Sequence, residues 1–366
     1  MRNQLTRRDF AIRTAGFGLA GFGLAMTLAP AATLAESEQA SRSETSPAVA
    51  DPYSLVDPEL LPALKQFPAS FDLSAETVRQ FRQMPGTPPL PAPAPQPVER
   101  HIPGPPGAPE VRLWVVDPAP SEKNKPLLLH MHGGGFMMTG PGWMPLLQEI
   151  ATDCHCVVIS VEYRLAPETR YPGALEDNYA ALKWVHAHAA ELGIDRSRIA
   201  VGGESAGGTH AASLAIHARD RNKEDVPICF QLLIYPALDD RTGSSHPAPP
   251  AIGHFMWTPS ANRFAWSSLL GVPSGSSKVP VAAVPARVAS VAGLPPAWIG
   301  VGALDLFVEE DIEYARRLVH AGVATELRVV RGAFHGFDIL VPDAEISKQF
   351  TASWKSALRK AFGTSS

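Results

Sequence analysis

The sequence has little net charge and, beyond its first few dozen residues, no long hydrophobic run. Its 366 residues include 32 Lys and Arg against 36 Asp and Glu, which gives a formal net charge of −4. The basic residues are scattered rather than clustered, so we expect no nucleic-acid partner. No later segment is long and apolar enough to cross a bilayer, so we expect no membrane span in the mature chain. An internal repeat is also absent.

Cysteine is scarce, and its placement argues against a disulfide framework. The 3 cysteines are Cys154, Cys156 and Cys229. The run 154–161 is rich in β-formers, and strand alternation would place Cys154 and Cys156 on one face, where a direct bridge would be strained. Pairing of Cys229 with either one stays open, although buried free thiols are the favoured interpretation.

The N-terminus has the pattern of a twin-arginine export signal. Arg7 and Arg8 precede a Gly- and Ala-rich apolar stretch, and small residues follow up to Ala35. A transmembrane anchor and an amphipathic N-terminus are the alternatives, but the apolar stretch is short and glycine-rich for a span. We therefore predict a signal peptide at 1–35, the twin-arginine export machinery as a partner, and a periplasmic or secreted enzyme.

Composition divides the rest of the chain into two parts. Residues 36–97 hold a small-polar stretch, apolar clusters at helical spacing between 51 and 84, and a proline-dense connector that we interpret as a surface linker. Residues 98–366 form the main domain. Within it, 239–296 is rich in Pro and Ser and separates two expected strands. So long an insertion is usually functional, and we expect it to belong to a cap.

The main domain alternates apolar runs of strand length with helical patterns. This alternation predicts an α/β fold with a mostly parallel sheet covered by helices on both faces. A helix is expected over 174–192, closed by Gly193. The expected strands are 111–116, 126–131, 157–161, 199–201, 228–234, 298–301 and 326–330.

The stretch Gly203-Glu204-Ser205-Ala206-Gly207 is the most informative in the chain. A serine between two glycines, directly after a strand, is typical of a nucleophile elbow, where only glycine leaves room for the neighbouring backbone. A glycine run follows the strand 126–131, and Asp305 and His335 come later in the chain. The order Ser, Asp, His predicts a serine hydrolase.

These motifs resemble the hormone-sensitive-lipase-like branch of the α/β-hydrolases, the bacterial family IV carboxylesterases. The resemblance extends from about residue 95 to the C-terminus. Two positions depart from the family's pattern, since Glu204 stands where Asp is more usual and Leu306 where proline is usual. The matching motifs are HGGGF at 132–136, YRLAPE at 163–168, GESAGG at 203–208, Asp305 with Glu309 and Glu310 behind it, and HGF at 335–337.

The predicted catalytic residues are Ser205, Asp305 and His335. Ester hydrolysis needs a nucleophile and a base that takes its proton and returns it to the leaving alcohol, and these are Ser205 and His335. Asp305 would hold the imidazole in the correct tautomer. Glu309 is the competing acid, although it suits the N-terminal dipole of the following helix better.

The oxyanion hole is predicted from backbone N–H groups. Two of Gly133, Gly134 and Gly135, together with the N–H of Ala206, should form it, and the resemblance favours Gly134 and Gly135. Phe136 and Met137 follow this loop and are candidates for an apolar substrate pocket, with simple core packing as the alternative. The motif YRLAPE is interpreted as a structural brace for the loop.

No metal and no cofactor are expected. His130, His132 and His155 could in principle bind a metal, but no carboxylate or thiolate completes such a site at a recognisable spacing. In the family, His132 orients the loop. The remaining histidines in helical patterns are interpreted as surface or packing residues.

We predict a serine carboxylesterase that acts on a small-molecule ester with short or medium acyl chains. A lactonase, an amidase or an acyltransferase would use the same triad and stays an alternative. A ligand-binding protein on a hydrolase fold is a third possibility, because plant hormone receptors are similar to this family. Those receptors have typically lost the catalytic base, which His335 supplies here. The resemblance also implies a possible homodimer, paired through the edge strand near 326–330.

Overall fold

The computed structural model describes residues 51–66, 73–84, 87–138, 144–221 and 226–364. The predicted export signal and residues 36–50 lie outside the described residues. Within the described ranges, no helix is long and apolar enough to cross a membrane.

One mixed sheet of 8 strands forms the centre, in the order β1-β2-β4-β3-β5-β6-β7-β8. The first two pairs along this order, β1 with β2 and β2 with β4, are antiparallel, and all the others are parallel. This arrangement confirms the predicted α/β fold. The strands are β1 (Val98–Ile102), β2 (Val111–Val116), β3 (Lys125–Met131), β4 (Val157–Glu162), β5 (Ile194–Glu204), β6 (Phe230–Ile234), β7 (Ala297–Gly302) and β8 (Thr325–Val330).

Seven of these strands match the predicted runs, but β1 was not predicted. Its sequence, VERHI, has four exposed side chains and a single buried one, Ile102. An edge strand of this kind has no apolar run to reveal it. The inner strand β3 is the opposite case, because all of its residues are buried and its centre is the apolar run 127–129.

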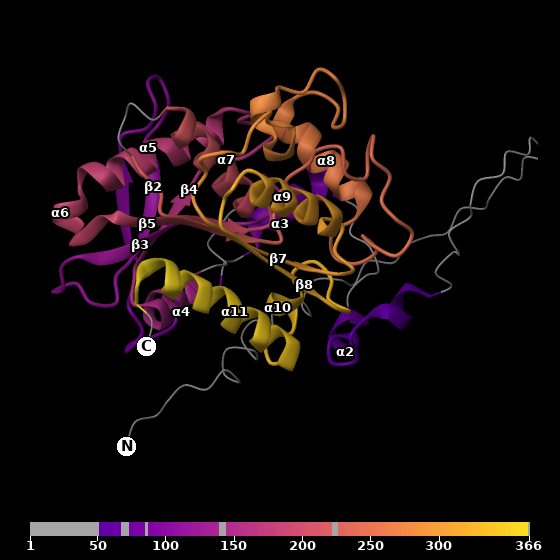
Figure 1. The fold of residues 1–366 in the computed structure, drawn as a ribbon, viewed down its shortest axis with the longest axis horizontal. Coiled ribbons are helices and arrows are strands. Elements are labelled where there is room, and N and C mark those ends of the chain that lie inside the picture. The colour runs from indigo at the N-terminus through magenta and orange to yellow at the C-terminus, as the bar shows by residue number, and fades with distance from the viewer. Residues whose placement is uncertain (1–50, 67–72, 85–86, 139–143, 222–225, 365–366) are drawn as a thin grey trace, which may run out of the picture.

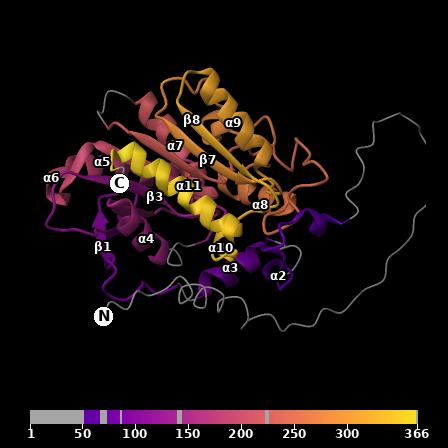
Figure 2. The same cartoon turned by 60° about the horizontal axis from the view of Figure 1, so that its bottom comes forward.

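Helices cover both faces of the sheet (Figure 1). The helices α5, α7 and α9 pack on one face, whereas α4 and α11 lie together on the other, where the turned view shows them in front of the strands (Figure 2). The helices are α2 (Leu61–Leu64), α3 (Ala75–Gln83), α4 (Met144–Cys154), α5 (Gly173–Ala187), α6 (Ala189–Leu192), α7 (Ala206–Asp220), α8 (Pro259–Leu270), α9 (Val308–His320), α10 (Phe337–Leu340) and α11 (Glu345–Phe362), with short 3-10 turns η1 (Pro52–Leu55), η4 (Val281–Ala283) and η5 (Pro285–Arg287).

The single helix predicted over 174–192 is divided into α5 and α6. The division falls at His188, whose backbone leaves the helical region (φ −105°, ψ 17°). Its imidazole is hydrogen-bonded to the carbonyl of Trp184 and stacks on that indole. The predicted C-terminal end of the helical stretch is confirmed, because Gly193 ends α6 in the left-handed conformation with φ 66°.

The N-terminal segment packs beside the 239–296 insertion. The ring of Tyr53 lies 4.9 Å from that of Phe255, and the N–H of Asp57 donates to the carbonyl of Gly332. Val78, on α3, is buried in the same apolar cluster as Trp257 and Trp266. The two parts predicted to form a cap therefore contact each other.

All three cysteines are free thiols. The strand prediction for the first two is wrong, because Cys154 is the last residue of α4 and β4 begins only at Val157. Burial raises the pKa of the Cys154 thiol to about 11, so this group is not a reactive thiolate. Cys156 is fully buried, and Cys229 is half-buried just before β6.

The strand β8 is an outer strand of the sheet with apolar side chains on its surface. Leu327 is 37% exposed and Val329 is 41% exposed. Pairing of two copies through this edge stays a prediction, which sedimentation of the purified chain would test by giving the mass of a dimer or of a monomer.

Candidate active site

Ser205 lies at a sharp turn between β5 and α7. Its backbone has φ 54° and ψ −121°, a conformation that side chains rarely adopt. A Cβ atom on Gly203 or on Gly207 would lie 2.0 Å from the carbonyl oxygen of Met131, so both positions require glycine. The elbow predicted from the sequence is therefore present, and the N-terminus of α7 directs its dipole at the serine.

Ser205, His335 and Asp305 are joined by two hydrogen bonds. Oγ of Ser205 is 3.0 Å from Nε2 of His335, and Nδ1 of His335 is 2.8 Å from Oδ2 of Asp305. A carboxylate can only accept, so Nδ1 carries the proton and Nε2 is left to accept from the serine hydroxyl. Asp305 is 1% exposed, and its second oxygen accepts from the N–H of Phe307.

Aromatic rings surround the imidazole of His335. Tyr235 and Phe307 present their edges to it, at 4.9 Å and 5.1 Å between ring centroids. Trp257, from the 239–296 insertion, lies 6.1 Å away. These rings restrict the imidazole to one orientation and limit the access of water to it.

The glycine run after β3 forms a tight loop opposite the elbow. Gly134 and Gly135 have φ angles of 112° and 58°, and the carbonyl of Gly134 accepts from the N–H groups of Met137 and Met138. Among the described residues, no protein acceptor is bonded to the N–H of Gly134 or of Gly135. Ala206 is the first residue of α7, so its N–H has no acceptor within the helix.

The motif YRLAPE contacts this loop directly. The hydroxyl of Tyr163 donates to the carbonyl of His132 at 2.7 Å, and the two rings stack at 4.3 Å. The N–H of Ala166 donates to the carbonyl of Phe136. These contacts agree with a bracing role.

Burial determines the state of His132. Desolvation lowers its pKa to about 4, so it is neutral at neutral pH. Its Nδ1 lies 2.8 Å from the carbonyl of Gly133 and donates to it. A neutral imidazole held in this way agrees with the loop-orienting role that the resemblance implies.

The pocket candidates and the other histidines are packed in the core. Phe136 is 2% exposed and Met137 is fully buried, and the Phe136 ring packs against Trp266 at 4.9 Å. His130 is hydrogen-bonded to Ser160 and to Glu204, the residue before the nucleophile. Among the residues that the structure describes, His, Cys, Asp and Glu side chains form no group of three that could hold a metal ion.

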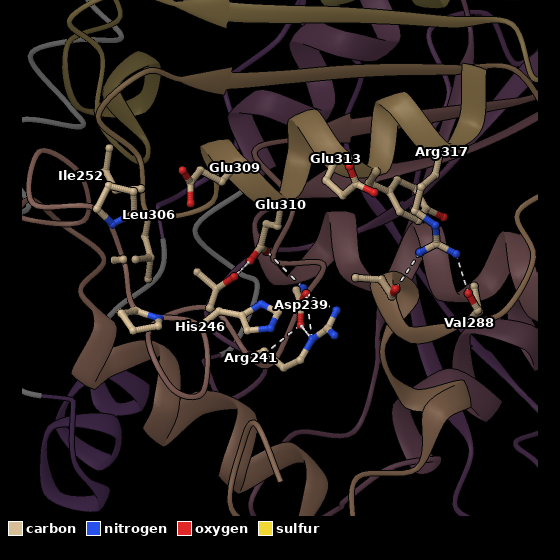
Figure 3. A pocket seen from close by; sticks show the side chains of 16 residues that line it. Asp239, Arg241, His246, Ile252, Val288, Leu306, Glu309, Glu310, Glu313 and Arg317 are labelled. Atoms are coloured by element: carbon tan, nitrogen blue, oxygen red, sulfur yellow. Dashed lines mark hydrogen bonds and ion pairs between the residues drawn. The ribbon is translucent and has the colours of Figure 1, made fainter. Parts of the chain in front are cut away.

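Glu309 and Glu310, at the start of α9, line a separate pocket whose lining does not include His335. This pocket has a volume of about 440 Å³ and is also lined by Asp239. Figure 3 shows its lining side chains from close by. Glu310 accepts from the N–H groups of Leu238 and Asp239 and from the hydroxyl of Thr242. The geometry therefore favours Asp305 over Glu309 as the partner of the imidazole.

Two residues near the site carry no sequence signal. Trp257 lies against the glycine loop, since a Cβ atom on Gly135 would be 2.5 Å from its indole. Arg82, on α3, donates to the carbonyl of Met137, 55 residues further along the chain. Neither residue belongs to a recognisable motif, so only the folded chain reveals them.

Comparisons with known proteins give one consistent answer. Residues 128–339 match a family described as having the alpha/beta hydrolase fold. The chain is 36% identical to esterase LipI of Mycobacterium tuberculosis (strain H37Rv) over 299 residues, covering 79% of this chain and 89% of the relative. It is also 36% identical to carboxylesterase NlhH of Mycobacterium tuberculosis (strain CDC 1551) over 327 residues, covering 86% and 99%.

Solved structures are similar as well. A bacterial heroin esterase is 37% identical, with a TM-score of 0.74, and the match covers 85% of this chain and 99% of that one. Esterase LipW from Mycobacterium marinum is 31% identical, with a TM-score of 0.73 and coverage of 85% and 97%.

Proposed function

This chain belongs to the hormone-sensitive-lipase-like branch of the α/β-hydrolases and is a carboxylic ester hydrolase, and we propose that Ser205, His335 and Asp305 perform the reaction on short and medium acyl esters. The hydrogen-bonded chain from Ser205 through His335 to Asp305 is the observation that carries this proposal. No part of the reaction requires a cofactor.

In the first half of the reaction, Oγ of Ser205 attacks the ester carbonyl carbon while Nε2 of His335 takes its proton. The carbonyl oxygen becomes an anion, and the N–H groups of Gly134, Gly135 and Ala206 stabilise it. When the bond to the alcohol breaks, His335 returns the proton to the leaving oxygen. An acyl group is then bonded to Ser205.

In the second half, water replaces the alcohol. His335 takes a proton from the water, whose oxygen attacks the acyl carbon, and a second oxyanion forms in the same hole. Collapse returns the proton to Oγ of Ser205 and releases the carboxylic acid. Asp305 stabilises the imidazolium in both halves without being protonated.

The acyl preference can be measured with p-nitrophenyl esters of increasing chain length. We expect kcat/KM to be highest for short and medium acyl chains, because the buried rings of Tyr235, Phe307 and Trp257 surround His335 and leave little room beside it. A preference for long-chain esters alone would contradict this substrate class. Absence of hydrolysis for the whole series would contradict the esterase function itself.

We further propose that residues 51–84 and 239–296 form a cap over the site, with Trp257 as one wall of the acyl pocket. Trp257→Phe leaves space beside Gly135 and His335. We expect the relative kcat/KM for a medium over a short acyl ester to rise by about tenfold, a size that one methylene commonly contributes in an apolar pocket. An unchanged acyl profile would show that Trp257 lies outside the pocket.

We also propose that the chain is exported by the twin-arginine pathway. Changing Arg7 and Arg8 to Lys keeps the charge but removes the pair that the export receptor reads. The precursor should then stay in the cytoplasm, as fractionation and immunoblotting would show, whereas the neighbouring substitution Arg13→Lys should leave export intact. Normal export of the double variant would contradict the proposal.

A further inference from the structure

One side chain of the N-terminal segment reaches into the wall of the oxyanion hole. Arg82 projects from the last turn of α3. Its Nε donates to the carbonyl oxygen of Met137 at 2.7 Å, and its Nη2 donates to the carbonyl oxygen of Ala166 at 2.7 Å. Nη1 and Nη2 also contact the carboxylate of Glu168 at 2.8 Å and 3.0 Å.

The first of these acceptors belongs to the oxyanion loop. The carbonyl of Met137 is two residues beyond Gly135, and the N–H of Met137 donates back to the carbonyl of Gly134. The orientation of the Met137 carbonyl is thus tied to the turn that presents the glycine N–H groups. Between them, Phe136 has a φ of 67°, which a residue with a side chain keeps only when its surroundings enforce it.

The second acceptor joins the loop to its brace. The N–H of Ala166 donates to the carbonyl of Phe136, while the carbonyl of Ala166 accepts from Arg82. One guanidinium therefore bridges two backbone segments that meet beside the oxyanion hole. The rigid fork of an arginine can do this, whereas the single ammonium of a lysine cannot reach the acceptors in the same geometry.

The contact with Glu168 is secondary. The side chain of Glu168 is 64% exposed, whereas that of Arg82 is only 22% exposed. An ion pair so open to water contributes little. Hydrogen bonds from a charged donor to two backbone carbonyls are stronger and more directional.

We propose that Arg82 is a positioning residue for the oxyanion hole, so that the N-terminal segment takes part in turnover as well as in covering the site. This role rests on the proposed function, because it assumes that Gly134 and Gly135 stabilise the oxyanion. Arg82 acts through the Met137 and Ala166 carbonyls and does not touch the reacting atoms.

The test compares Arg82→Ala with two matched variants on a short-chain p-nitrophenyl ester. Removal of one oxyanion donor costs about 100- to 1000-fold in kcat, and displacement of the loop should cost part of that, about 10- to 100-fold. KM should change little. The first control is Arg79→Ala, since Arg79 lies on the same helix and pairs with the exposed Glu76. The second is Glu168→Gln. Both variants should leave kcat within about threefold of the native value.

The affinity for a trifluoromethyl ketone inhibitor is a readout that a loosened cap alone would not change. Its adduct with the nucleophile places an oxyanion in the hole, so its inhibition constant should rise in Arg82→Ala by the same factor by which kcat falls. Added guanidinium ion at millimolar concentration should restore part of the lost kcat in this variant and none in Arg79→Ala. Arg82→Lys, which keeps the charge, should resemble Arg82→Ala in kcat and serves if the alanine variant does not fold.

The outcomes distinguish failure of the Arg82 proposal from failure of the proposed esterase function. A raised KM with unchanged kcat and unchanged ketone affinity would show that Arg82 only secures the cap, and would overturn the inference. Full kcat in Arg82→Lys would also overturn it, because charge alone would then suffice. If the unmodified protein hydrolysed no ester, the proposed function would fail first.

Discussion

Replacing Ser205 by Ala is expected to lower kcat by about six orders of magnitude. A catalytic triad acts as one unit, so it loses nearly all of its rate enhancement when the nucleophile is removed. The hydroxyl is the only nucleophilic group at the elbow, and it already lies 3.0 Å from the imidazole that takes its proton. The small side chain of Ala fits the same turn, so the fold should be kept.

Hydrolysis of a p-nitrophenyl ester measures this loss, and a fluorophosphonate probe should label the native chain at residue 205 and not the variant. Ser213→Ala is the matched control, since Ser213 is a buried serine further along the same helix, α7. Its activity should stay near that of the native chain. A Ser205→Ala variant that kept more than about a tenth of the native rate would rule out the acyl-serine mechanism.

Asp305→Asn is expected to lower kcat by about four orders of magnitude while the protein stays folded. The amide oxygen of Asn can still accept from the N–H of Phe307, as Oδ1 of Asp305 does. Its NH₂ group must then point at Nδ1 of His335, which has to become an acceptor. The ring proton moves to Nε2, where it prevents the imidazole from accepting the proton of Ser205.

Glu309→Gln is the matched control for this loss. Glu309 is exposed and lines the separate cavity in Figure 3 rather than the triad. The kcat of Glu309→Gln should stay within about threefold of the native value, since this substitution removes no interaction made in the transition state. The reverse ranking of the two variants would assign the acid to Glu309.

Much of the fold could be predicted because its elements are encoded locally. The buried strands β3 and β4 contain the apolar runs 127–129 and 157–159, and a residue's neighbours along the chain suffice to identify them. The exposed edge strand β1 has no such pattern. Cys154 was misplaced because no glycine or proline lies between the end of α4 and the start of β4 to mark the boundary.

The candidate catalytic residues could be predicted for the same local reason. A nucleophile elbow requires glycine at 203 and 207, because any Cβ atom there would meet the Met131 carbonyl. A backbone oxyanion loop likewise requires glycine at positive φ. Such steric demands leave a recognisable spacing in the sequence, and this spacing is enough to identify Ser205, the glycine run and the order of Asp305 and His335.

The sequence by itself thus determined the fold class, the family and the candidate nucleophile, base and acid, since each depends on residues that are close in the chain or on a motif order. Only the tertiary structure decided which acid faces His335, that Trp257 covers the glycine loop, and that Arg82 is bonded to the Met137 carbonyl. These contacts join residues dozens of positions apart. Their partners are chosen by how helices and loops pack over the sheet, and neither periodicity nor spacing along the chain carries that information.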